Sequence, residues 1–105
     1  MKQVGVCLAA LLLLVSGPVA AQEADVRAGR MLAETNCAEC HAVRAGERPA
    51  PTNAPPFERI ANMPGMTPLA LQAALQTSHR TMPNVMLTPD ELRGIVRYIR
   101  TLRRD

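Results

Sequence analysis

The chain is short of the apolar side chains from which a protein of its size normally builds a core. Beyond residue 21 it has 84 residues, of which only 23 are apolar and larger than alanine, and only Phe57 and Tyr98 are aromatic. A domain this small is marginally stable when side chains alone fill its interior, so it usually contains a crosslink, a metal or a cofactor. We therefore expect a single domain whose centre is filled in part by something other than side chains.

Residues 1–21 have the pattern of a secretory signal peptide. Lys2 precedes a 12-residue apolar stretch, Val4–Val15, and small residues lie just before Gln22. Cleavage there predicts an exported, periplasmic domain over residues 22–105 with no membrane span. An uncleaved membrane anchor is the alternative, but a spanning helix needs roughly 17 apolar residues or more.

The remainder of the chain predicts helices joined by long loops, and it has no alternating pattern typical of a strand. The capping box Thr88-Pro89-Asp90-Glu91 begins a last helix with a continuous apolar stripe, and Thr67-Pro68 begins the helix before it. Asp25 is the candidate N-cap of the first helix. The fold class is all-α, with helices predicted over residues 25–37, 57–62, 68–78 and 89–103 and loops over residues 42–56 and 79–87.

Both cysteines beyond residue 21 belong to one motif, Cys37-Ala38-Glu39-Cys40-His41. Two thiols three residues apart on a helical turn share one face and can react with the two vinyl groups on one edge of a haem, and the next histidine can bind the iron. This C-x-x-C-H pattern is the signature of covalent haem attachment. A haem-free exported dithiol is a weaker alternative because no strand–helix unit surrounds the motif, and a zinc site lacks the usual ligand spacing.

The sequence resembles small class I c-type cytochromes, and the resemblance extends over nearly all of residues 22–105. Gly29 lies eight residues before Cys37. After the haem motif come a proline pair before an aromatic residue, a Met-Pro pair and a last helix that contains a tyrosine. These later features are Pro55-Pro56-Phe57, Met82-Pro83 and Tyr98.

The resemblance implies a fold wrapped around one haem c and a role for each matching residue. Cys37 and Cys40 form thioethers, and the iron is bound by His41 on one side and Met82 on the other. Either Pro55 or Pro56 accepts a hydrogen bond from His41 Nδ1–H. Gly29 allows the first helix to cross the last one closely, against Ile95 and Tyr98. The sequence departs from better-known members at Ala33, where a large aromatic residue is common.

The residues themselves also favour Met82 as the distal ligand. Met82 and Met86 both lie in the loop between the last two helices, where the chain must return over the open haem face. Pro83 stiffens the backbone at Met82, so less entropy is lost when the sulfur is held. His79 is interpreted as a loop-bonding histidine. A haem propionate could pair with Arg44, Arg48 or Arg80.

These observations predict a monohaem one-electron carrier that is not an enzyme by itself. Its partners are redox proteins, which it meets as a monomer in transient complexes. An alternative is a cytochrome subunit of a periplasmic dehydrogenase or oxidase. Eleven arginines and nine acidic residues beyond residue 21 give a charge too small and too mixed for nucleic-acid binding.

Overall fold

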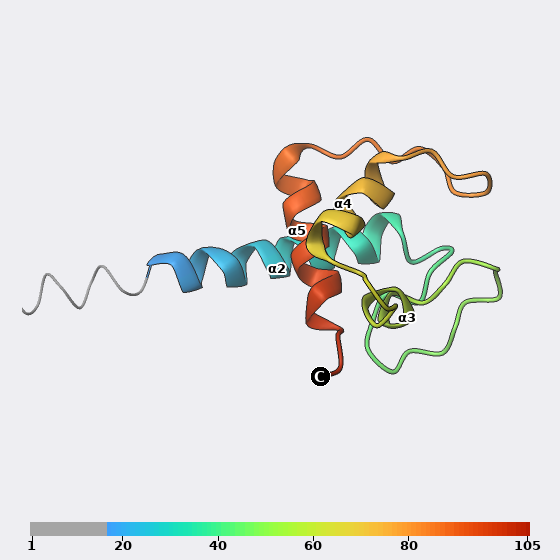
Figure 1. The fold of residues 1–105 in the computed structure, drawn as a ribbon, viewed down its shortest axis with the longest axis horizontal. Helices are drawn as coiled ribbons and strands as arrows, with labels where there is room; N and C mark the ends of the chain where they lie inside the picture. The colour runs from blue at the N-terminus through green and yellow to red at the C-terminus, as the bar shows by residue number, and fades with distance from the viewer. Residues whose placement is uncertain (1–16) are drawn as a thin grey trace, which may run out of the picture.

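The computed structural model describes residues 17–105, and the predicted apolar stretch of the signal peptide lies outside them. Helices account for all the regular secondary structure in this range, which confirms the predicted all-α class (Figure 1). No helix within residues 17–105 combines the length and the apolar character that crossing a membrane requires. The four helices are α2 (Gly17–Asn36), α3 (Phe57–Ala61), α4 (Pro68–Gln76) and α5 (Pro89–Thr101).

Helix α2 begins before the predicted N-cap, so the expected start at Asp25 was wrong. Pro18 is tolerated in the first helical turn, and the following alanine, glutamine and glutamate residues favour a continuous helix. The Asp25 carboxylate instead accepts hydrogen bonds from Arg93 at 3.0 Å and Arg97 at 2.6 Å. Asp25 therefore ties α2 to α5 and does not begin a helix.

Helices α2 and α5 cross at a pair of glycines (Figure 1). A Cβ atom on Gly29 would lie 2.0 Å from the carbonyl oxygen of Gly94 and 2.9 Å from the backbone nitrogen of Ile95. The close crossing predicted at Gly29 is thus present, and Ile95 is at the contact as expected. The backbone that α2 meets is mainly that of Gly94, whereas the Tyr98 hydroxyl bonds elsewhere, to Val43.

The core lies where α2, α3 and α4 pack against α5. The predicted capping box is present at Thr88 and Glu91, and Thr67 caps α4 through the N–H of Ala70. The apolar stripe of α5 faces inward, with Ile95 1% exposed. The buried apolar residues are Ala33, Ala42, Val43, Phe57, Ala61, Leu71, Leu92, Ile95, Val96, Tyr98, Ile99 and Leu102.

Two long loops extend from the helices on the side away from the start of α2 (Figure 1). The first, residues 42–56, joins α2 and its following turn to α3, and the second, residues 77–88, joins α4 to α5. The predicted boundaries of these loops differ from the observed ones by at most two residues, because α4 ends at Gln76 and not near Ser78. The haem motif and Met82 therefore lie at the loop side of the molecule.

Candidate haem site

The Cys37–His41 motif forms a tight turn directly after the end of α2. The Cys37 N–H donates to the Ala33 carbonyl at 2.9 Å, and the His41 N–H donates to the Cys37 carbonyl at 2.9 Å. Cys37 is half-buried, Cys40 is exposed, and both are free thiols. Burial raises the pKa of the Cys37 thiol. The turn thus presents two unpaired cysteines beside the candidate iron ligand.

The His41 ring is oriented by a carbonyl of the first loop. Its Nδ1 lies 2.6 Å from the carbonyl oxygen of Pro55, which selects Pro55 over Pro56 as the partner. A carbonyl can only accept a hydrogen bond, so Nδ1 carries a proton, and in the neutral ring the lone pair is then on Nε2. This is the tautomer that a metal bound at Nε2 requires.

Phe57 fixes the far end of the same loop against His41. The two rings have centroids 5.2 Å apart and planes inclined by 53°. The Phe57 N–H donates to the Ala42 carbonyl at 2.9 Å. This bond joins the first residue of the loop to the first residue of α3, which follows the loop. The loop is therefore closed at its base, and Pro55 is held near the imidazole.

Further hydrogen bonds that the sequence did not predict hold this loop. The Thr52 hydroxyl donates to the Cys40 carbonyl, and the Glu47 carboxylate accepts the N–H groups of Val43 at 2.8 Å and Arg44 at 3.0 Å. Tyr98 of α5 donates its hydroxyl to the Val43 carbonyl, and burial raises the pKa of that hydroxyl. An acceptor three or four residues after the N–H groups that it bonds is a weak sequence signal, which explains why Glu47 was missed.

Ionic contacts occupy one of the three arginines considered for a propionate. Arg44 donates to Glu34 at 2.9 Å, and Arg30 bonds the same carboxylate oxygen. Hydrogen bonds from Arg30 and Arg44 lower the pKa of Glu34. Arg44 thus joins the first loop to α2, whereas the structure assigns no partner to Arg48 or Arg80 among the described residues.

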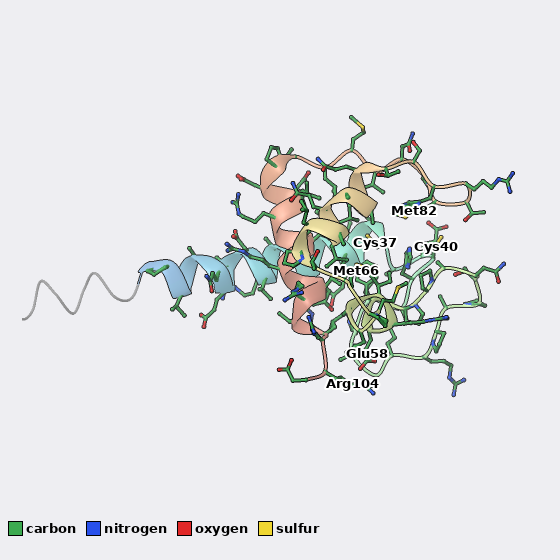
Figure 2. All side chains as sticks on the ribbon, in the orientation of Figure 1. Cys37, Cys40, Glu58, Met66, Met82 and Arg104 are labelled. Carbon is green, nitrogen blue, oxygen red and sulfur yellow. The ribbon has the colours of Figure 1, made fainter. Side chains whose placement is uncertain are left out.

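The second loop carries Met82 half-buried, whereas Met86 of the same loop is 92% exposed. In the view of Figure 2, the Met82, Cys37 and Cys40 labels lie on the loop side of the helices, and Met66 lies nearer the core. Met66 packs against the core cluster. His79 donates Nε2–H to the Ala74 carbonyl at 2.7 Å, so this loop histidine bonds the end of α4.

The residues at the motif fit a haem c. Two unpaired thiols, a histidine that is bonded to Pro55 through Nδ1, and a half-buried methionine make up the donor set that such a haem uses. No group of three or more histidine, cysteine or acidic side chains that could hold a metal ion occurs among residues 17–105. A groove of about 970 Å³ between α2, α4 and α5 lies apart from the motif and contains none of these donors.

The fold, the attachment motif and the oriented histidine together define a c-type cytochrome. Residues 24–99 match the family described as cytochrome c oxidase, cbb3-type, subunit III, and the chain belongs to this family of class I c-type cytochrome domains. Electron transfer with a covalent haem c is the function that this membership carries. Searches of the curated proteins and of the solved structures gave no match.

Proposed function

We propose that the chain binds one haem c through Cys37 and Cys40, with His41 and Met82 as the two iron ligands, and passes single electrons between redox proteins. The observation that carries this proposal is the bond from His41 Nδ1 to Pro55 O, because it leaves Nε2 ready for iron. When bound, the haem iron supplies reversible one-electron chemistry.

Groups of the protein around the iron would set the reduction potential of the haem. The Pro55 carbonyl makes the imidazole of His41 a stronger donor, which favours the oxidised state. A thioether ligand from Met82 has the opposite effect and raises the reduction potential. Protein ligands on both sides of the iron would leave no open position for a small molecule.

Exposure supports Met82 over the other methionines. Met86 is 92% exposed and Met31 of α2 is 68% exposed, so both side chains point largely into solvent. Met66 is engaged with the core. Met82 combines partial burial with a place in the loop that follows α4.

Two settings for the electron transfer are possible, and they differ in whether the chain is bound stably or transiently to its partner. The family description favours a subunit that delivers electrons within an oxidase complex. A free carrier that forms transient complexes is the second candidate. In either setting we propose that residues 1–21 direct export and that the domain acts in the periplasm.

Haem binding is tested by a pyridine haemochrome spectrum of the protein produced with a haem-attachment system. We expect one covalent haem per chain, and Cys37→Ala or Cys40→Ala should weaken the attachment. A spectrum without covalent haem would favour the haem-free dithiol alternative. Isolation of the tagged chain from solubilised membranes of its source then separates the two settings, because only a subunit should remain bound to an oxygen-consuming complex.

The distal ligand is tested by Met82→Ala with Met86→Ala as the matched control. Met82→Ala should abolish the ferric methionine–iron charge-transfer band, lower the reduction potential and allow imidazole to bind. Met86→Ala should leave all three unchanged because its side chain is exposed. Loss of the band in Met86→Ala, with the band retained in Met82→Ala, would reverse the assignment.

A further inference from the structure

The backbone directly after His41 is buried without belonging to a helix. Ala42 is 3% exposed and Val43 is 1% exposed. Their peptide groups have no place in a helical ladder, and buried N–H and C=O groups are costly when they lack partners. The partners of this short segment therefore decide where the backbone that carries His41 lies.

Two side chains hold the backbone of Val43, one at its N–H and the other at its carbonyl. The Glu47 carboxylate accepts the Val43 N–H at 2.8 Å, and the same oxygen accepts the Arg44 N–H at 3.0 Å. The Tyr98 hydroxyl donates to the Val43 carbonyl at 2.5 Å from α5, 55 residues away in the sequence. Loop and helix thus share one anchored residue.

The anchored residue is coupled to the imidazole through its neighbour. Ala42 accepts the N–H of Phe57, and Phe57 lies two residues after Pro55, whose carbonyl accepts the His41 proton. A displacement of Val43 would move Ala42 relative to Phe57. The hydrogen bond between His41 and Pro55 would then lose its alignment, because His41 is the neighbour of Ala42 in the chain and Pro55 lies two residues before Phe57.

We propose that Glu47 and Tyr98 are positioning residues for His41, which hold Val43 so that the His41 Nδ1–H stays bonded to the Pro55 carbonyl. The proposal rests on the proposed function, in which Nε2 of His41 binds the haem iron. Neither residue touches the iron site by its own side chain in this role. Both act through the backbone, with Glu47 exposed and Tyr98 5% exposed.

The test measures solvent exchange of the His41 Nδ1–H proton by nitrogen-15 NMR of the full, haem-loaded ferrous protein. Covalent haem is first verified by its pyridine haemochrome spectrum, so a failure of the proposed function appears there and not in the exchange rate. The variants are Tyr98→Phe, which removes only the hydroxyl, Glu47→Ala, and Glu47→Gln, which keeps an acceptor oxygen.

Asn62→Ala is the matched control for a loss of stability alone. Asn62 donates to the Leu102 carbonyl and accepts the Arg104 N–H, and its described side-chain hydrogen bonds do not involve Ala42 or Val43. Tyr98→Phe and Glu47→Ala should speed the exchange roughly three- to tenfold beyond the change in Asn62→Ala, the factor expected for one lost hydrogen bond. Glu47→Gln should restore the original rate.

The midpoint potential gives a second readout that a purely structural role would not move. A weaker His41–Pro55 bond makes the imidazole a poorer donor, so the potential should rise in Tyr98→Phe and Glu47→Ala. The proposal is overturned if the Nδ1–H exchange in either variant is no faster than in Asn62→Ala.

Discussion

The two loops that carry the proposed iron ligands are held in different ways. Residues 42–56 begin with two buried residues and receive hydrogen bonds from distant parts of the chain, including Tyr98 of α5. Residues 77–88 contain no buried residue, and their described side-chain hydrogen bonds span at most six residues, as between Ser78 and Asn84. The first loop is bonded to remote parts of the chain, whereas the second is bonded to itself and to the adjoining ends of α4 and α5.

This difference indicates how the two iron ligands would behave. A ligand held by many independent contacts loses little entropy on binding and is difficult to displace. His41 is of this kind. Met82 would depend more on its own bond to iron, so external ligands should compete on the side of the second loop and leave His41 in place.

The largest effect should come from removing the group that both loops are expected to enclose. We predict that Cys37→Ala combined with Cys40→Ala, produced without haem, is largely unfolded, because 12 buried apolar residues make a small core. Far-UV circular dichroism measures the loss of helix. Glu39→Ala keeps both thiols and should fold with haem attached, while full native helicity in the double variant would contradict the prediction.

The helical frame that supports the first loop can be broken at the glycine crossing. In Gly29→Ala the new methyl group would lie 2.0 Å from Gly94 O, so we expect a loss of about 3 kcal/mol in the free energy of unfolding. In Gly94→Ala the nearest atom is Asp25 O at 3.0 Å, and the better helix propensity of alanine, about 1 kcal/mol, offsets part of the strain. Urea unfolding of the two haem-loaded variants should show this asymmetry, and equal losses would argue against it.

The second loop can be loosened without touching Met82. Asn84→Ala removes the 2.8 Å hydrogen bond from the Ser78 hydroxyl. We expect imidazole to bind the ferric protein roughly two- to tenfold more tightly, because opening the loop then costs one hydrogen bond less. Asn53→Ala, the same change in the first loop, is the control. Equal imidazole affinities in the two variants would mean that the loops do not differ as described.

The smallest effect concerns Glu58 of α3, which anchors the first loop to the chain end. Hydrogen bonds from the Gly46 N–H at 3.2 Å and from Arg104 hold the pKa of Glu58 below its ordinary value of 4.5. The ionised carboxylate therefore adds stability above pH 4.5, and that stability is lost as the pH falls through the lowered pKa.

Glu58→Gln should accordingly be less stable than the unmodified protein at neutral pH, with a difference that shrinks below pH 4.5. Urea unfolding across this range measures the difference, and Glu23→Gln, which removes an exposed carboxylate of α2, is the control. A difference that stays constant into acid would show that the carboxylate charge of Glu58 contributes nothing.

The sequence by itself determined the features that are encoded locally. The haem motif occupies five consecutive residues, and the caps at Thr67 and Thr88 fix the starts of α4 and α5 within a single turn. The apolar stripe of the last helix identified part of the core, namely Leu92, Ile95, Val96, Ile99 and Leu102, since helical periodicity needs no knowledge of distant residues. The all-α class and the cytochrome c family follow from these short-range signals.

Only the tertiary structure decided which distant groups meet. Pro55 and Pro56 are equivalent in the sequence, and the choice depends on how the first loop brings back to His41 a residue that lies 14 positions along the chain. Asp25 has the chemistry of a helix cap, but it bonds Arg97, 72 residues away, because the helix crossing brings the two together. Hydrogen bonds between such remote residues depend on the packing of whole elements, and no local pattern of residue types records that packing.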